Sequence, residues 1–225
     1  MNRNDHIHII TTADGSHSLL NTDLSETYHS QHGAIQESIH VFIRNGLNYY
    51  LQNYASAQIN ILEIGFGTGL NAYLSLLEVL EKPCKVFYNS LEAYPLSREI
   101  WSQLNYSSDS NAHYFFKLHE CEWNKLEEIH PNFKLHKQHV KLEDVELPNN
   151  KFDLVYFDAF APNKQPEMWS LEILEKVVGA MPPNSVFVTY CAKGQLKRDL
   201  RTLGLRVETL PGPPGKKEMI RALKI

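Results

Sequence analysis

Short apolar runs alternate with amphipathic stretches along most of the chain. Apolar residues recur at helical spacing between Ser38 and Tyr54, and a compact apolar run follows at 59–64. The same reading predicts further strands at 85–91, 152–157 and 185–190 and further helices at 70–80, 95–104, 167–181 and 195–203. Because strands that alternate with helices form a mostly parallel sheet covered on both faces, we predict an α/β fold.

Both ends of the chain depart from this alternation. Residues 1–35 are polar and predict turns and short strands, with a hairpin ending at Leu19-Leu20. Near the C-terminus, 206–210 and 218–223 flank the turn-forming run Pro211–Gly215. These two segments therefore predict a closing antiparallel hairpin.

The stretch 107–135 has the least regular pattern. Within it, Trp123–His130 has the spacing of a helix that Pro131 would end. We predict a helix there and leave the rest of the stretch unassigned.

Size and composition limit the class of protein. The chain has 225 residues, of which 43% are hydrophobic and 21% charged, as in globular domains. No apolar run reaches the roughly 18 residues that cross a bilayer, and residues 1–14 lack an apolar signal-peptide core. Three well-separated cysteines form no disulfide framework. We expect a cytoplasmic protein without membrane contact, in which an extension, 1–35, packs on a single Rossmann-like catalytic domain, 36–225.

Charge is distributed unevenly along the chain. The net charge is −4, but from residue 193 onward nine basic and three acidic residues give +6, which leaves −10 for residues 1–192. A local basic patch can bind phosphates even on an acidic protein. A solvated basic face is the equally open alternative.

Eleven histidines raise the question of a metal site. His6-Ile7-His8 and His29-x-x-His32 have short spacings, but no carboxylate or cysteine cluster accompanies them. We predict no metal.

A glycine-rich turn joins the predicted strand at 59–64 to the helix at 70–80. It reads Glu63-Ile-Gly65-Phe-Gly67-Thr-Gly69, and Leu70 stands where a dinucleotide fingerprint requires glycine. The pattern E-x-G-x-G-x-G is instead typical of class I S-adenosylmethionine-dependent methyltransferases, whose fold is a Rossmann-like, mostly parallel seven-stranded sheet with a C-terminal antiparallel hairpin. Gly65, Gly67 and Gly69 would then line this cofactor, and Glu63 would hold the loop.

Two acids follow predicted strands at the edge where parallel sheets bind ligands. Glu92 follows the strand 85–91, 23 residues after Gly69, and is predicted to bind ribose hydroxyls, with a helix-capping role as the alternative. Asp158 ends the strand 152–157 and is predicted to orient an amine and help remove its proton. The alternative for Asp158 is a loop cap.

The segment that begins at Asp158 resembles a known family. It reads Asp158-Ala-Phe-Ala-Pro-Asn-Lys-Gln-Pro-Glu-Met-Trp169 and is similar to the D-(G/A)-F-A-P-x-(K/R)-x-P-(E/D)-(M/L)-W signature of MnmD-like tRNA wobble-uridine methyltransferases. These proteins are equivalent to the methyltransferase half of the bifunctional MnmC enzyme. Glu26–Phe42, Gly65–Asn71 and Gly212–Met219 resemble the other blocks of the family.

This resemblance implies a reaction and a set of residues. The primary amine of 5-aminomethyl-(2-thio)uridine at tRNA position 34 would receive a methyl group from S-adenosylmethionine, and no flavin oxidoreductase half is expected. Residues implied at the site comprise Thr68 and Asn71 for the cofactor, Tyr28, Glu37 and Phe160 for the substrate pocket, and Lys193, Lys216 and Lys217 for tRNA phosphates. The family's acidic pair near adenine is displaced or missing in 136–144, so we assign no adenine contact there. The sequence indicates no oligomeric state.

Two other functions remain open at this point. One is a methyltransferase or aminopropyltransferase that acts on a small free amine. The other is a non-enzymatic module that binds S-adenosylmethionine or RNA.

Overall fold

The structure is a computed structural model that describes residues 6–54, 56–107 and 110–225. The described strands are β1 (Ile7–Thr11), β2 (His17–Asn21), β3 (Glu26–Thr27), β4 (Gln58–Ile64), β5 (Lys85–Glu92), β6 (Leu126–His130), β7 (Phe133–His139), β8 (Leu154–Phe157), β9 (Ser185–Thr189), β10 (Leu205–Pro211) and β11 (Glu218–Lys224). The described helices are α1 (Ala34–Ser38), η1 (Ile39–Asn48), α2 (Tyr49–Asn53), α3 (Leu70–Val79), α4 (Arg98–Trp101), α5 (Ala112–Glu120), η2 (Pro166–Trp169), α6 (Leu171–Gly179) and α7 (Gly194–Thr202).

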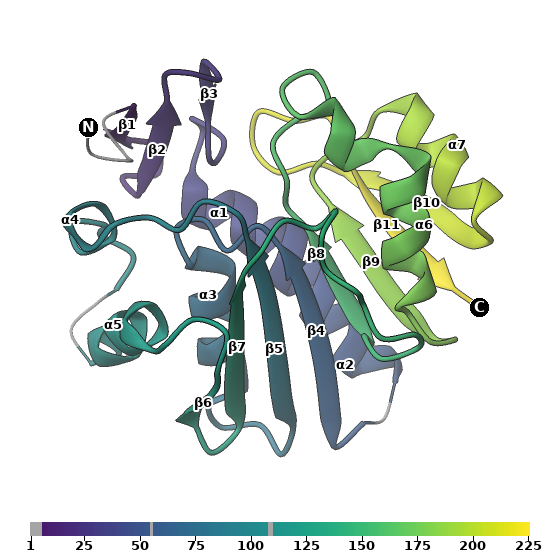
Figure 1. Ribbon diagram of the computed structural model, residues 1–225, viewed down its shortest axis with the longest axis horizontal. Coiled ribbons are helices and arrows are strands. Elements are labelled where there is room, and N and C mark those ends of the chain that lie inside the picture. Colours follow the sequence, from purple (N-terminus) through teal and green to yellow (C-terminus); the bar gives the residue numbers. More distant parts are fainter. Residues whose placement is uncertain (1–5, 55, 108–109) are drawn as a thin grey trace.

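The large sheet has eight strands among the described residues, in the order β10-β11-β9-β8-β4-β5-β7-β6 (Figure 1). The five central strands β9, β8, β4, β5 and β7 pair in parallel, and β6, β11 and β10 pair antiparallel. The α/β class and the closing hairpin are therefore confirmed. The expected number of seven strands is wrong, because β6 adds an edge strand beside β7.

The helix predicted at 123–130 is also wrong. Leu126–His130 forms β6, which pairs antiparallel with β7 across the tight turn at Pro131-Asn132. The ladder to β7 pairs the backbone groups on the inner side of β6, and an ion pair between Lys134 and Glu128 (3.7 Å) adds a cross-strand contact. The helix of this region lies earlier in the chain, at α5.

Three predicted helices have different bounds. The helix expected at 95–104 is reduced to α4. The helix expected at 167–181 is split, because the Ser170 hydroxyl caps a new helix, α6, by accepting a hydrogen bond from Ile173 N (3.3 Å). The helix expected at Ser38–Tyr54 begins earlier, at α1, and continues through the π-helical η1 into α2. In η1, a Cβ on Gly46 would lie 3.1 Å from both Tyr156 and Val188, so glycine lets this helix approach the sheet closely.

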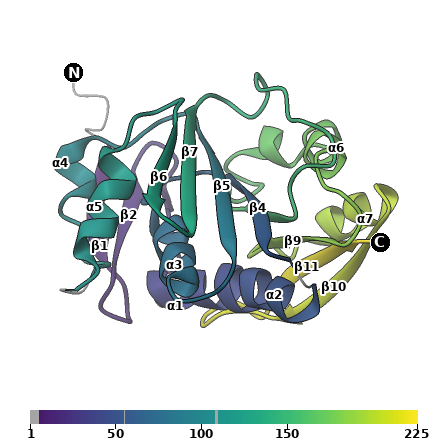
Figure 2. The same ribbon diagram turned by 90° about the horizontal axis from the view of Figure 1, so that it is seen from below.

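The strands β4, β5, β8 and β9 contribute residues to two cores, one on each face of the sheet, as the strand period of two requires. On β8, for example, Leu154 and Tyr156 face one core, whereas Val155 and Phe157 face the other. The first core packs against η1, α3 and α5, and the second against α6 and α7 (Figure 2). The sheet is thus covered on both faces, and its carboxyl edge between the helical layers stays available for a site.

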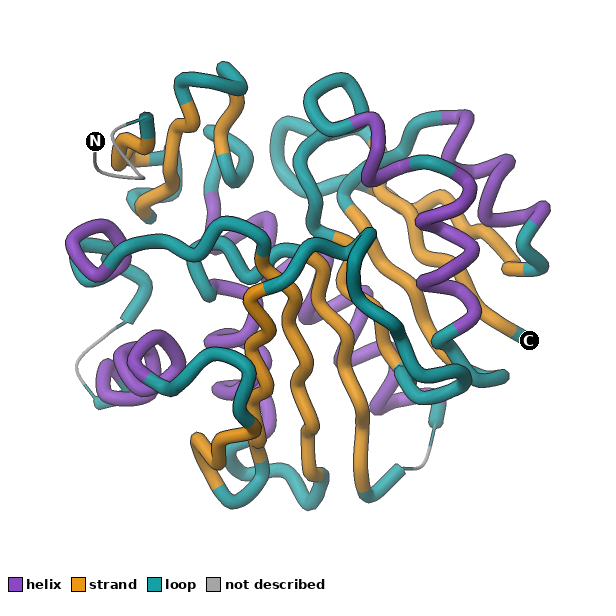
Figure 3. The backbone as a smooth tube through the Cα atoms, viewed as in Figure 1, coloured by secondary structure: helices purple, strands orange, loops and turns teal. Residues whose placement is uncertain are grey.

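A separate three-stranded sheet, β1-β2-β3, lies beside the carboxyl ends of the large sheet (Figures 1 and 3). It contains the predicted N-terminal hairpin, β1 paired antiparallel with β2, and is fastened through His17 N, which donates to Asn105 Oδ1 (2.7 Å). The division at residue 35 stays a prediction. Among the described helices, none combines the length and apolarity needed to cross a membrane.

Candidate active site

The glycine turn between β4 and α3 has a backbone that only glycine adopts readily. Gly65, Gly67 and Gly69 have φ values of 92°, 48° and 71°. A Cβ on Gly65 would lie 3.1 Å from the Asp158 carbonyl oxygen, and one on Gly69 would lie 2.8 Å from His119 Nε2. The turn is therefore fixed both by conformation and by close packing beneath it.

Two buried side chains that the sequence analysis missed support this turn. The His119 ring stacks on Trp101 (4.7 Å between centroids), and its Nε2–H donates to the Thr68 carbonyl oxygen (3.1 Å). Burial lowers the pKa of His119 to about 3, so the ring is neutral. Lys137 Nζ donates to the His119 carbonyl oxygen (2.8 Å) and lies 5.3 Å from the Phe66 ring centroid. No sequence pattern indicated a role for His119 or Lys137, because His119 lies on α5 and Lys137 on β7, and neither element was predicted.

Glu92 ends β5 directly opposite the glycine turn. Its Oε2 accepts a hydrogen bond from Gly67 N (2.9 Å), and its Oε1 accepts one from Tyr94 N (2.8 Å). Burial raises the pKa of the carboxyl group, partly offset by these two backbone donors. The predicted juxtaposition of turn and carboxylate is present.

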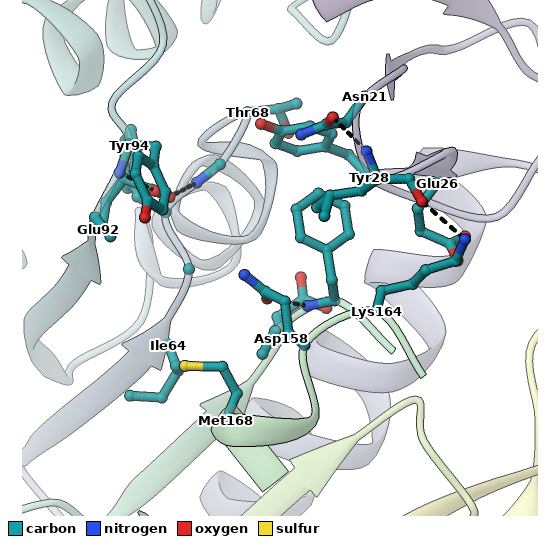
Figure 4. Close-up of a pocket in the computed structure, with 18 of the residues that line it drawn as sticks. Asn21, Glu26, Tyr28, Ile64, Thr68, Glu92, Tyr94, Asp158, Lys164 and Met168 are labelled. Carbon is teal, nitrogen blue, oxygen red and sulfur yellow. Dashed lines mark hydrogen bonds between the residues drawn. The ribbon is translucent and has the colours of Figure 1, made fainter. Parts of the chain in front are cut away.

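A cavity of about 1110 Å³ opens over the turn. Figure 4 shows Glu92 and Tyr94 on one side, Tyr28, Glu26 and Lys164 on the other, and Asp158 between them. Of the residues to which the sequence assigned a cofactor, substrate or tRNA role, those that line this cavity are Tyr28, Glu37, Gly65, Gly67, Thr68, Asn71, Glu92, Asp158, Phe160 and Lys216. Glu63, Gly69, Lys193 and Lys217 do not line it. The last residue of β7, His139, and residues 140–143 after it do line the cavity, although none of them was assigned a role.

Asp158 lies at the end of β8, where the two sides of the cavity meet. Its Oδ2 accepts a hydrogen bond from Asn71 Nδ2 (2.8 Å), on the first turn of α3. Burial, reinforced by the charge of Glu37, raises the pKa of Asp158 to about 7, against the opposing effects of Asn71 and Lys216. A carboxyl group with this pKa can exchange a proton near neutral pH.

Glu63 lies beneath the cavity rather than in its wall. The side chain is fully buried on β4, and its Oε2 accepts a hydrogen bond from Ser90 Oγ (2.6 Å) on β5. Burial, with a contribution from the charge of Asp158, raises the pKa of Glu63 to about 8. The structure thus places Glu63 as a support of the strand ends, without direct access to a ligand.

An aromatic pair lines the side of the cavity opposite Glu92. The Phe160 and Tyr28 rings meet edge to face, with centroids 5.0 Å apart. The backbone of Phe160 is held by Trp169 Nε1, which donates to its carbonyl oxygen (2.8 Å). Lys164, in the segment between β8 and η2, donates to the Leu24 carbonyl oxygen (2.8 Å). This hydrogen bond connects that segment to the turn between β2 and β3 of the N-terminal sheet.

The three lysines predicted to contact phosphates differ in their surroundings. Lys216 lines the cavity and forms an ion pair with the buried carboxylate of Glu37. Lys193 and Lys217 are exposed. Among the described residues, no group of three or more histidine, cysteine or acidic side chains has the arrangement of a metal site.

A family model described as "S-adenosyl-L-methionine-dependent methyltransferase" matches residues 104–225. The chain is also 30% identical, over 94% of its length, to the tRNA 5-methylaminomethyl-2-thiouridine biosynthesis bifunctional protein MnmC of Pseudoalteromonas atlantica. The MnmC protein of Leptospira interrogans is 29% identical over 87% of the chain. In both cases the chain spans about a third (32%) of the relative's length.

Solved structures are similar as well. The crystal structure of MNMC2 from Aquifex aeolicus matches 97% of this chain and 70% of that chain, with a TM-score of 0.81 and 26% sequence identity. The CurJ carbon methyltransferase covers 88% of this chain and 56% of that chain, with a TM-score of 0.53 and 14% identity. The second likeness concerns the fold alone.

Proposed function

Because the chain belongs to the S-adenosyl-L-methionine-dependent methyltransferase family, we propose that it methylates an amine on tRNA. The substrate is the primary amine of 5-aminomethyl-(2-thio)uridine at wobble position 34, and the product is the 5-methylaminomethyl derivative. The observation that carries this proposal is Asp158, a cavity-lining carboxyl group with a pKa of about 7, held beside the glycine turn. Similarity to MnmC proteins named for 5-methylaminomethyl-2-thiouridine biosynthesis supports the choice of substrate.

The residues around the glycine turn fit the family's cofactor. A Cβ on Gly65 would crowd the Asp158 carbonyl oxygen, so the bare backbone keeps this wall of the cavity open. In our proposal Gly65, Gly67 and Thr68 hold the amino-acid end of the cofactor, and Glu92 holds the ribose hydroxyls. S-adenosylmethionine supplies a methyl group on an electrophilic sulfonium sulfur. Asn71 keeps Asp158 oriented, because its Nδ2 donates a hydrogen bond to Asp158 Oδ2 (2.8 Å).

Asp158 prepares the nucleophile in this proposal. Methyl transfer is an in-line displacement, so the nitrogen lone pair must be free and aimed at the methyl carbon. Asp158 accepts a hydrogen bond from the amine and takes a proton from its ammonium form. Once this proton has passed from Asp158 to solvent, the ionised carboxylate stabilises the positive charge that develops on nitrogen during methyl transfer. The Tyr28 and Phe160 rings provide apolar surface for the uracil base.

The tRNA would bind outside the cavity, and the two parts of the chain would act together. Exposed Lys193 and Lys217 are the candidates for phosphate contacts, and such a substrate implies action in the cytoplasm. We also propose that the extension, 1–35, and the domain, 36–225, form one catalytic unit. Supporting this, Tyr28 from the first and Asp158 from the second line one cavity.

One experiment tests the proposed function directly. Total tRNA from a strain that lacks the gene is incubated with the full chain and S-adenosylmethionine, and its nucleosides are analysed by mass spectrometry. We expect a 5-aminomethyluridine derivative to gain one methyl group. Transfer to free polyamines while tRNA stays unmodified would favour a small-amine transferase instead, and binding without any transfer would favour a non-enzymatic module.

A further inference from the structure

One ion pair joins two distant parts of the chain at the wall of the cavity. Lys216, in the turn between β10 and β11, pairs with Glu37 on α1. Glu37 is only 4% exposed, and its second carboxylate oxygen accepts a hydrogen bond from Ser30 N. The Lys216 ammonium also lies 3.8 Å from the centroid of the Tyr190 ring. Both charges are therefore fixed in position.

This ion pair belongs to the charged surroundings of Asp158. The titratable groups that interact with Asp158 come from each neighbouring element, namely Glu37 of α1, Glu63 of β4, Tyr88 of β5, Tyr190 after β9 and Lys216 of the β10–β11 turn. Glu37 raises the pKa of Asp158 and Lys216 lowers it, and the effect of Glu37 is the larger. The two partners thus oppose each other at the same carboxyl group.

We propose that the Glu37–Lys216 ion pair sets the proton affinity of Asp158, and with it the pH at which the substrate amine becomes nucleophilic. This inference rests on the proposed function, because it takes an amine as the substrate. In the step concerned, an N–H bond of the ammonium group breaks, the electron pair stays on nitrogen, and the proton moves to the Asp158 carboxylate. Glu37 and Lys216 act through Asp158 and are positioning residues.

The physical reason lies in the position of the three groups in the wall of one cavity, where Glu37 is buried and Asp158 and Lys216 are half-buried. In a site partly shielded from water, a charge in the same cavity wall acts on the ionisation of Asp158 more strongly than it would through bulk water. Glu37 alone would keep Asp158 protonated and unable to accept a proton near pH 7. Lys216 alone would make Asp158 too weak a base and would repel the incoming ammonium. Paired, they leave the pKa of Asp158 at about 7, where proton transfer is reversible.

The first test observes Asp158 itself. Full-length protein with ¹³C-labelled aspartate carboxyl groups is titrated by NMR without tRNA or cofactor, and Asp158→Asn assigns the signal. We expect the titration midpoint of the Asp158 carboxyl group to be lowest in Glu37→Gln, higher in the double variant Glu37→Gln/Lys216→Met, higher again in wild type and highest in Lys216→Met. Each single variant should differ from wild type by about half a pH unit or more. Lys217→Met, one residue along and exposed, is the matched control and should leave the midpoint unchanged.

The second test uses activity. Asp158 must be ionised to accept a proton, so the acid limb of kcat/KM with tRNA should move to higher pH in Lys216→Met and to lower pH in Glu37→Gln. Lys216→Arg, which keeps the charge, should restore the wild-type profile. If Glu37→Gln does not fold, Lys216→Met and Lys216→Gln still decide, because the Lys216 side chain is 31% exposed and its loss is tolerable.

The two failures can be told apart. If the wild type methylates tRNA but all variants share its acid limb and its Asp158 midpoint, the inference is overturned and the proposed function stands. If the wild type leaves tRNA unmodified, the proposed function fails, while the order of NMR midpoints still decides whether the ion pair controls Asp158.

Discussion

Asp158 owes its chemistry to burial at the end of a strand. An aspartate on an exposed loop has a pKa of about 3.8, whereas the pKa of Asp158 is raised to about 7. The Asn71 amide and the charges of Glu37 and Lys216 then fix its orientation and ionisation. In the proposed function, this single residue joins the side of the cavity that holds the cofactor to the side that holds the substrate.

Replacement of Asp158 by asparagine tests this role. The amide keeps the size of the side chain but cannot take a proton, so we expect kcat to fall at least about 100-fold. The affinity for S-adenosylhomocysteine, measured by calorimetry, should stay within about twofold. Asp199→Asn on α7, outside the cavity, is the matched control. Equal kcat in Asp158→Asn and wild type would contradict a role for Asp158 in the reaction.

Glu63 should make stability depend on pH. Its pKa is raised to about 8 in the folded chain from an ordinary value of 4.5, so the folded state binds the additional proton between these values. The stabilisation that this proton provides is complete below about pH 4.5 and is lost as the pH rises through 8. Thermal denaturation between pH 5 and 8 should show wild type losing stability relative to Glu63→Gln, by at most about 1 kcal/mol per pH unit. Parallel curves for the two proteins would contradict burial of the acid.

The glycine turn is the element whose shape depends most on packing from outside it. Gly69 begins α3 with a left-handed φ of 71°, and the buried His119 ring lies directly beneath it. His119 comes from α5, and Lys137, which holds it, comes from β7. The sequence pattern predicts the turn, but the side chains that support it lie about 50 to 70 residues away along the chain.

Two glycine substitutions distinguish the cost of a left-handed backbone conformation from the cost of steric contact with neighbouring atoms. Gly69→Ala would place a Cβ 2.8 Å from His119 Nε2, whereas Gly204→Ala, at a similar φ of 87°, meets nothing within 4 Å. Gly204→Ala should cost about 1 kcal/mol of stability with unchanged cofactor affinity. Gly69→Ala should cost more and weaken S-adenosylhomocysteine binding at least about 10-fold. Stability comes from denaturant titration and affinity from calorimetry; equal effects of both changes would rule out a role for the packing.

The strand β6 illustrates why element prediction failed in one region. Residues 123–130 contain a polar, weakly patterned segment in which only Ile129 of the strand is buried. Its state is decided by the available edge of β7, which supplies hydrogen-bond partners for the backbone. Local spacing carries no information about that edge.

At the scale of the whole molecule, much of the C-terminal positive charge is compensated internally. Lys197 pairs with Glu218 (2.7 Å), and Arg221 pairs with Glu208 (2.8 Å). Lys224 donates to the Val178 carbonyl oxygen (2.9 Å) instead of facing solvent as an isolated charge. Because Glu208 and Glu218 are already counted in the +6, these two pairs do not lower it. The Lys216–Glu37 pair draws on an acid outside the segment and leaves a net +5 from residue 193 onward.

Exposed lysines near the carboxyl edge of the sheet should still contribute to tRNA affinity. Lys193 follows β9, and Lys217 lies in the β10–β11 turn. If each contacts one phosphate, its replacement by methionine should raise KM for tRNA and reduce the slope of log affinity against log salt by about one. Lys85→Met, an exposed lysine at the amino end of β5, is the control and should keep the wild-type slope. Unchanged slopes in Lys193→Met and Lys217→Met would assign tRNA binding to another surface.

The sequence by itself determined the α/β class, the glycine turn, the closing hairpin and the positions of Glu92 and Asp158 at strand ends. These features follow from local periodicity and from the rule that the carboxyl ends of parallel strands lie at one edge of a sheet. Both can be applied from residues that are close together in the sequence. Only the tertiary structure decided that Glu63 lies beneath the cavity, that Lys216 pairs with Glu37 and that His119 supports the turn. Such contacts depend on which distant elements pack together, and so does the burial that moves the pKa of Asp158 to about 7.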